Sequence, residues 1–322
     1  MGRPNELVET LESILSQSIL PLEVVIIDDS PDDSVKNAVE GIRKAFSSRS
    51  VSIRYIRNPR QKGLPIARNE GAKEAKGDIV LFLDDDVQLD DDYVKGILEV
   101  FERDPDAKGA QGFHGKHLGP RLKDRLANSL DRVFMIWSYD DHTCRVMPSF
   151  NATYPTDPEG IIESQWMSGC NQAYRREVFK ELSFDEKIRR YGCEDLDMSY
   201  RVWRRYPHKV FLTSRAKLAH RYSPVSRAPK RNQVVLTTVH LHYLFYKNMD
   251  QTVKNRTLFC WSWFGRIVSS FLRRTKAQVK DGVAEPAFAE VGFILEGLAL
   301  SRRYKEELKR GDLKFLEKYL TF

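Results

Sequence analysis

The chain has 322 residues, of which 41% are hydrophobic and 30% charged, so it is a globular chain with an ample core and not a disordered one. Its formal net charge of +7 favours a polyanionic partner: a nucleotide diphosphate, a phospholipid surface or a nucleic acid. Four cysteines lack the spacing of zinc ligands, which favours a reducing, cytoplasmic location, and we expect neither a signal peptide nor a transmembrane segment.

The first hundred residues alternate patterns typical of helices and strands. In chain order we expect a helix over 7–15, a strand over 22–29, a helix over 35–46, a strand over 51–56, a helix over 65–76, a strand over 78–83 and a helix over 92–103. This alternation predicts an α/β fold with a mostly parallel sheet that helices cover on both faces.

The remainder of the chain changes character twice. Residues 106–193 are irregular and contain several glycines, after which a helix begins at Glu194 and a strand from Lys209 leads toward His220. From about residue 229 the sequence consists of helical patterns rich in Lys, Arg and aromatic residues. We therefore predict a boundary near Arg227, with a first domain over 1–227 and a helical extension over 228–322.

Three consecutive carboxylates follow the apolar run over 78–83. They are Asp84, Asp85 and Asp86, and they fall at the carboxyl end of a strand, where open α/β sheets bind their ligands. Hard divalent cations such as Mg²⁺ or Mn²⁺ take carboxylate ligands together with the oxygens of a substrate diphosphate. The alternative is a solvated acidic turn that caps the next helix.

Four stretches, taken in order, resemble the family 2 glycosyltransferases, which have the GT-A fold and use nucleotide-sugar donors. The resemblance covers roughly residues 3–225 and implies a donor half of about 1–105 and an acceptor half of about 106–227. The four stretches are Val24-Val-Ile-Ile-Asp28-Asp29-Ser30, Asn58 through Gly63 and Arg68 to Gly71, Leu81-Phe-Leu-Asp84-Asp85-Asp86, and Phe184-Asp185-Glu186 leading to Glu194-Asp195.

The resemblance implies a donor site. Asp29 would accept hydrogen bonds from the nucleotide base, Arg68 would lie beside the donor, and Asp84 and Asp85 would bind the nucleotide sugar, with Asp85 facing the ribose. It also implies metal ligands, with Asp86 binding the divalent cation. A further candidate ligand is His220, which follows a strand; a lone histidine is as often structural or exposed.

The same resemblance implies the chemistry of an inverting transferase. Asp195, paired with Glu194, would take the proton from the acceptor hydroxyl as it attacks the anomeric carbon, and two adjacent acids raise at least one pKa. Trp166, Gly169 and Asn171 would line the acceptor side, although a tryptophan here suits a buried position equally well.

One departure from the family concerns the start of the sheet. Family members begin with a hydrophobic strand, whereas this chain opens on the helix that should follow it. Without that strand, two neighbouring strands would expose unpaired backbone edges in the core, which is costly. We predict that the natural start lies upstream or that another segment fills the gap.

The helical extension allows two interpretations. Aromatic clusters that include Trp261 and Trp263 are flanked by basic residues, a pattern that suits helices lying in the interface of an anionic membrane. Such a location would suit an enzyme whose acceptor is a lipid-linked or polysaccharide glycan. The alternative is a helical subdomain that packs on the first domain or on another subunit. The bases are Lys247, Arg256, Arg266, Arg273, Arg274 and Lys276.

Three rival functions deserve comparison with the transferase. A degenerate, non-catalytic transferase acting as a membrane-associated or assembly module is favoured by the missing strand and disfavoured by Asp86 and Asp195. Nucleic-acid binding is disfavoured, because the bases are dispersed and no recognition motif is present. A glycoside hydrolase would use paired acids but would not need the acid triplet.

Overall fold

A computed structural model describes residues 3–58, 63–114, 122–140, 142–189, 192–221, 229–281 and 287–320. The elements predicted for the first hundred residues are present, and a short additional strand follows the acid triplet. This part of the chain comprises α1 (Pro4–Leu15), β1 (Glu23–Asp28), α2 (Ser34–Ser48), β2 (Ser52–Arg57), α3 (Leu64–Glu74), β3 (Ile79–Leu83), β4 (Val87–Leu89) and α4 (Tyr93–Arg103).

Helix α1 shows how the sequence sets these elements. Pro4 stands in its first turn, where a missing backbone N–H costs nothing. Leu7, Leu11 and Ile14 recur at helical spacing and are buried in one cluster with side chains of α2, β1 and α4. The apolar stripe therefore seats α1 beside the strands whose ends carry the acids.

The main sheet has the strand order β3-β9-β5-β10-β4, with β8 also paired to β10. Its further strands are β5 (Gly109–Phe113), β8 (Ile161–Glu163), β9 (Asn171–Arg175) and β10 (Val210–His220). The sheet is mixed and not mostly parallel as predicted, because β9 runs antiparallel to both β3 and β5. The polar sequence of β9 does not show the apolar alternation that predicts a strand. Asn171 and Gln172 of this strand are nevertheless buried, and their side chains donate hydrogen bonds to backbone carbonyl oxygens.

The space that a first strand would take lies between β1 and β3, and no described segment fills it as a strand. Strand β1 pairs with β2 in a separate parallel sheet, and β3 pairs with β9. A groove of about 570 Å³ is lined by both strands and by α1, and most of its lining is apolar, including Val25, Ile27 and Leu81. Among the described residues, no strand pairs with the two edges that line it.

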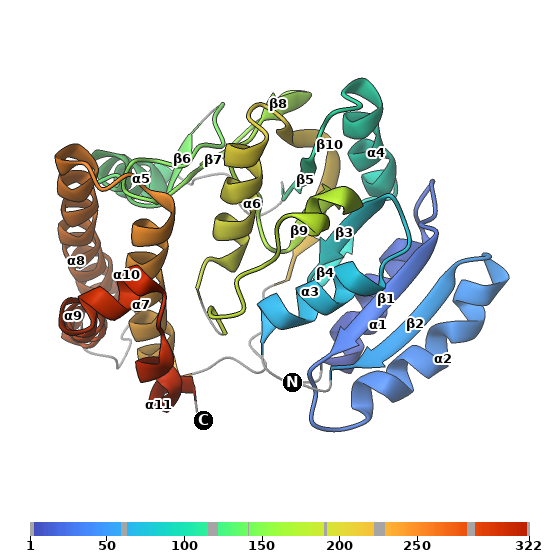
Figure 1. The fold of residues 1–322 in the computed structure, drawn as a ribbon, viewed down its shortest axis with the longest axis horizontal. Coiled ribbons are helices and arrows are strands. Elements are labelled where there is room, and N and C mark those ends of the chain that lie inside the picture. The colour runs from blue at the N-terminus through green and yellow to red at the C-terminus, as the bar shows by residue number, and fades with distance from the viewer. Residues whose placement is uncertain are drawn as a thin grey trace.

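The helical extension packs closely on the rest of the chain. Helix α7 buries Val235, Val239 and Phe245 in one cluster with Tyr154 and Leu196. Figure 1 shows α7 to α11 at one end of the molecule, β1, β2 and α2 at the other, and α6 between them. The extension consists of α7 (Lys230–Asn248), α8 (Val253–Asp281), α9 (Ala287–Arg303), α10 (Lys305–Arg310) and α11 (Glu317–Leu320).

The packing supports the subdomain interpretation of the extension without excluding a membrane surface on its outer side. No helix in the described ranges is both long and apolar enough to cross a bilayer. The remaining elements are α5 (Leu122–Val133), β6 (Ser138–Asp140), β7 (Thr153–Pro155), α6 (Glu194–Arg205) and two 3₁₀ helices, Arg176–Lys180 and Lys314–Leu316.

Candidate active site

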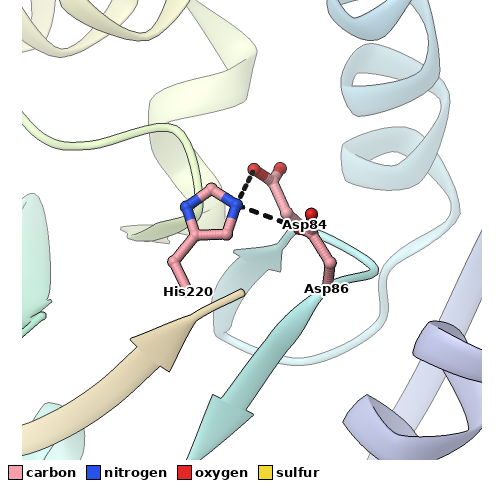
Figure 2. A group of neighbouring side chains, drawn as sticks. All are labelled: Asp84, Asp86 and His220. Carbon is pink, nitrogen blue, oxygen red and sulfur yellow. Dashed lines mark hydrogen bonds and ion pairs between the residues drawn. The ribbon is translucent and has the colours of Figure 1, made fainter. Parts of the chain in front are cut away.

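Two carboxylates and an imidazole meet at the end of the main sheet. Asp84 and Asp86 lie in the turn between β3 and β4, and His220 ends β10, which pairs antiparallel with β4 so that His220 stands opposite Val87. Figure 2 shows the ring facing both acids: its Nε2 lies 3.0 Å from Asp86 Oδ1 and 3.9 Å from Asp84 Oδ2. One ligand atom from each residue falls within 4.8 Å of the others, which suits a divalent cation.

Arg3 supplies positive charge to the same acids. Its guanidinium donates to Asp86 Oδ2 over 2.7 Å and lies 3.2 Å from Asp85 Oδ1. Thr10 lies about two helical turns after Arg3, and its hydroxyl donates to the backbone carbonyl oxygens of Asp85 and Val87. Helix α1 thus holds the acidic turn in place, and Arg3 before it offsets part of the negative charge of the turn. Sequence analysis missed Arg3, and its only signal is an arginine directly before the predicted helix.

A second acidic centre lies at the start of α6. Arg68 of α3 is only 5% exposed, and its guanidinium donates to Glu194 Oε1 over 2.9 Å and to the Gly169 carbonyl oxygen over 2.8 Å. The same guanidinium lies 3.5 Å from Asp84 Oδ1. Arg68 therefore joins the two acidic centres. The carboxylates of Glu194 and Asp195, which include the candidate general base, lie beside the candidate metal cluster.

Burial sets the protonation of this pair. Burial, and then the charge of Asp195, raise the pKa of Glu194 to about 7 against the opposing effect of Arg68. The pKa of Asp195 is also raised by burial, with Arg68 and the backbone amides of Leu196 and Gly169 opposing the shift. One carboxyl of the pair is therefore able to exchange a proton near neutral pH.

The backbone of Gly169 contacts both Arg68 and Asp195. Its N–H donates to Asp195 Oδ2 over 2.9 Å while its carbonyl accepts from Arg68. A Cβ at this position would lie 2.9 Å from Arg68 Nη2 and 3.2 Å from Asp195 Oδ2. Only glycine lets the backbone approach both groups.

Asp29 organises the ends of β1 and β2. Its carboxylate accepts from Asn58 Nδ2 over 2.6 Å and from the Gly63 N–H over 3.2 Å, so it joins the strand ends to the start of α3. Gly63 has a φ of 110°, and a Cβ there would meet the Arg189 carbonyl oxygen. Residues 59–62 of the predicted motif lie outside the described residues.

Comparison with known proteins decides the family. The model described as Glycosyl transferase family 2 matches residues 2–183. The chain belongs to this family. The inactive polypeptide N-acetylgalactosaminyltransferase-like protein 5 of Macaca fascicularis is 25% identical over 220 residues, which are 68% of this chain and 48% of that protein. The glucosyl-dolichyl phosphate glucuronosyltransferase of Haloferax volcanii is 29% identical over 112 residues, 35% of this chain and 34% of that protein.

These alignments span half or less of the length of the two relatives. Among solved structures, the mannosyltransferase PcManGT from Pyrobaculum calidifontis, in complex with GDP-Man and Mn²⁺, superposes with a TM-score of 0.54 at 15% identity. The match covers 99% of this chain and 82% of that one. It confirms the GT-A fold that the motifs predicted.

Trp166 of this family 2 chain takes the buried position, which is one of the two alternatives that its sequence allowed. The indole is only 1% exposed, its N–H donates to the Thr153 carbonyl oxygen, and Trp137 covers it edge-on with the ring centroids 4.6 Å apart. No ring face of Trp166 is therefore open to a sugar in this conformation, whereas Trp137 is exposed. Asn171 is also fully buried and donates to the Gly112 carbonyl oxygen.

His114 is a candidate that sequence analysis missed. It directly follows β5, and its ring stacks on Tyr154 with the centroids 4.6 Å apart. Within the described part of the chain neither ring nitrogen has a hydrogen-bond partner, although both are buried. Burial, and then the charge of His220, lower the pKa of His114 to about 4, so the imidazole is neutral at pH 7. The sequence feature that could have identified His114 is the same one that identified His220, namely a histidine that follows a strand.

Proposed function

We propose that this chain is an inverting glycosyltransferase that moves a sugar from a nucleotide-diphosphate donor to an acceptor hydroxyl. The observation that carries the proposal is the adjacency of two acidic centres joined by Arg68. One centre offers the ligand set of a divalent cation, and the other offers a carboxyl that exchanges protons near neutral pH. A single displacement at an anomeric carbon needs both functions.

The metal-side residues would be Asp84, Asp86 and His220, which would hold Mg²⁺ or Mn²⁺. Such an ion, when bound, neutralises charge on the departing nucleotide diphosphate. Two solved structures of similar fold, each 15% identical to this chain, support this assignment: GalNAc-T7 was solved with UDP, GalNAc and Mn²⁺, and PcManGT with GDP-Man and Mn²⁺. Asp29 would receive the base of the nucleotide, and Asp85 would face the ribose.

The base-side residues act on the acceptor. Asp195 would take the proton of the attacking hydroxyl, with its carboxylate oriented by the Gly169 N–H. Glu194, fixed by Arg68, shares the negative charge and raises the proton affinity of the pair. Because neither carboxylate needs to bond to the sugar, attack from the opposite face inverts the configuration.

The acceptor that we propose is a glycan, either lipid-linked or part of a polysaccharide, and the location is the cytoplasm or the inner face of the cell membrane. The basic composition of the helical extension supports this proposal. The related glucuronosyltransferase of Haloferax volcanii is named for a dolichyl phosphate substrate, which also supports a lipid carrier.

A non-catalytic role is the second candidate, and the groove between β1 and β3 favours it. Among the described residues no strand lies between them, so the facing edges of β1 and β3 have no strand partner near Asp29 and the acidic turn. Two of the similar relatives are also described as inactive. Against this candidate, the catalytic side chains retain mutual contacts that a pseudoenzyme does not need.

A thermal-shift experiment separates the two candidates. The protein is heated with UDP, GDP or dTDP, each with and without Mn²⁺, and a ligand at a hundred times its dissociation constant adds about 2.7 kcal/mol to the free energy of unfolding. We expect one nucleotide to stabilise the protein only with Mn²⁺. Asp86→Ala should abolish the effect and Asp91→Ala, which removes an exposed acid nearby, should not. No stabilisation by any nucleotide would favour the non-catalytic role.

A further inference from the structure

Six large apolar side chains are exposed on the outer side of the helical extension and on α5. They expose between 39% and 70% of their surface, far more than core residues do. We call them the outer apolar face, and they are Val133 of α5, Trp261, Phe264, Phe271 and Leu272 of α8, and Phe288 of α9.

The outer apolar face is continuous. The ring centroids of Trp261 and Phe264 are 5.6 Å apart, and the Trp261 indole donates to the Val133 carbonyl oxygen. Two helical turns further along, Phe271 contacts Phe288 with a centroid distance of 5.5 Å. Positions 261, 264, 268, 271 and 272 follow the spacing of one helix side. Scattered exposed apolar residues need no explanation, but a connected stripe does.

Helix α8 has already buried another side against the protein. Phe259 and Trp263 are each 6% exposed in the cluster that contains α7, and Gly265 lies against the Phe134 ring. Folding of the chain therefore consumes one apolar side of α8 and leaves a second one in water. An amphipathic helix needs only the first side to dock on its own domain, so the second one indicates an external apolar phase or partner.

Charge indicates which partner fits. Lys254 and Arg256 are exposed near the start of α8, and Arg132 is exposed beside Val133. Protein interfaces are depleted in lysine, whereas aromatic residues flanked by bases are typical of helices on anionic bilayers. The sequence of α8 sets seven bases against the single acid Asp281: Lys254, Arg256, Arg266, Arg273, Arg274, Lys276 and Lys280.

We propose that the outer apolar face docks this protein on the surface of an anionic lipid bilayer, with α8 lying in the plane of the interface. Figure 1 places α5 and α8 toward the end of the molecule opposite β1, β2 and α2, so docking there leaves those three elements away from the lipid. Docking would place the protein on the surface that carries a lipid-linked acceptor, the acceptor class of the proposed function on which this purpose rests. Docking itself requires no sugar transfer and is measured without donor.

Vesicle sedimentation tests the proposal on the full chain. Vesicles contain equal parts of phosphatidylcholine and phosphatidylglycerol, and neutral vesicles contain phosphatidylcholine alone. We expect binding to the anionic vesicles at low salt that weakens as salt screens the bases. The double variant Phe264→Ser, Leu272→Ser should lower the partition coefficient roughly tenfold or more, because two side chains lose their apolar burial.

Matched variants identify the surface. Leu22→Ser removes a leucine beside β1 that is even more exposed than Leu272, and it should leave the partition coefficient unchanged. Lys254→Glu with Arg256→Glu should weaken binding to anionic vesicles and leave any binding to neutral vesicles unaltered. The unfolding midpoint of each variant is measured first, and Phe264→Ala replaces any serine variant that does not fold.

A direct reporter confirms insertion. Cys260 is the exposed cysteine among the four and lies on the same side of α8 as Phe264, so an environment-sensitive fluorophore attached there should shift to shorter wavelength on anionic vesicles. Equal sedimentation of wild type and the Phe264, Leu272 variant would overturn the proposal. The proposal would also be overturned if the wild-type protein did not sediment with anionic vesicles. A dimer seen by light scattering that Phe264→Ser dissociates would then identify a second copy of the chain as the partner of this face.

Discussion

The two acidic centres of this protein are neutralised by arginines that are held very differently. Asp86 is matched by Arg3, which stands before α1 and is 25% exposed. Glu194 is matched by Arg68, which lies within α3, is 5% exposed and makes further contacts with Gly169 and Asp84. The first cation can leave its acids with a small movement of a helix start, whereas the second cannot leave without breaking the packing of α3 on the sheet.

This difference matches the two tasks that we propose for the centres. At a metal site, the arginine beside the acids must give way when a cation binds together with a diphosphate, so an arginine that is easily displaced suits such a site. A general base must keep a fixed position and a raised pKa between turnovers, so a permanent and buried counter-charge suits it. The predictions below separate the two centres by removing one partner at a time.

The largest expected effect follows from removing the base. Asp195→Asn keeps the side-chain shape but cannot accept the proton, so we expect release of nucleotide diphosphate from the donor to slow by roughly 10²- to 10⁴-fold. The Mn²⁺-dependent thermal shift should persist, because the metal cluster is intact. Glu194→Gln is the control for simple loss of charge, and an Asp195→Asn enzyme that matches wild type would assign the base elsewhere.

Removing the fixed arginine should mainly cost stability. Arg68→Met keeps the volume but leaves Glu194 and Asp84 without their counter-charge, so the free energy of unfolding should fall by about 3–5 kcal/mol at neutral pH. The loss should shrink at about pH 5, where Glu194 is protonated. Arg54→Met, which breaks more exposed ion pairs, should cost less than about 1 kcal/mol by urea unfolding.

The raised pKa of Glu194 predicts opposite trends for stability and rate. Its ordinary pKa is 4.5 and its folded pKa is about 7, so between these values the folded state binds more protons than the unfolded state. Its contribution to the free energy of unfolding therefore falls as pH rises through this window. The transfer rate should rise over the same window as the pair loses its proton. Glu194→Gln should flatten the stability trend, and a rate that falls toward neutral pH would contradict the assignment.

Removing Arg3 should have a smaller effect, and it should be a gain in metal affinity rather than a loss of function. Arg3→Gln removes a cation that competes for Asp86, so the affinity for Mn²⁺ alone should rise roughly tenfold. The measurement is the concentration of free Mn²⁺ by electron paramagnetic resonance during a titration. Arg221→Gln removes the same charge nearby, at an arginine whose side chain contacts Glu9 and Gln88 and neither Asp85 nor Asp86, so it should change the affinity less.

Residues at strand ends were predictable from sequence because strand patterns place them. The acid triplet and His220 each follow a strand, and the structure brings Asp84, Asp86 and His220 together. Asp84 was assigned to the nucleotide sugar, and it lies in the metal cluster as well. The catalytic, donor-binding, metal-binding and acceptor-side roles of all the predicted site residues stay predictions.

Other features depended on contacts between distant segments. The pairing of β9 with β3 and β5 follows from buried side-chain hydrogen bonds, which leave no periodic pattern in a polar strand. The burial of Trp166 follows from its bond to Thr153 and from Trp137, and neither could be deduced from its own neighbours in the chain. Arg3 reaches Asp86 across 83 positions of sequence.

The smallest predicted effect concerns His114, which belongs to neither acidic centre. His114→Phe keeps a ring stacked on Tyr154 and removes two buried nitrogens that have no partner among the described residues. Because an unsatisfied buried polar group is costly, the free energy of unfolding should rise by about 1 kcal/mol in urea titrations. His142→Phe, at an exposed histidine, should leave it unchanged. A gain in stability together with slower transfer would mean that the imidazole is kept for a substrate hydroxyl, and a loss of stability would mean that the folded chain itself uses those nitrogens.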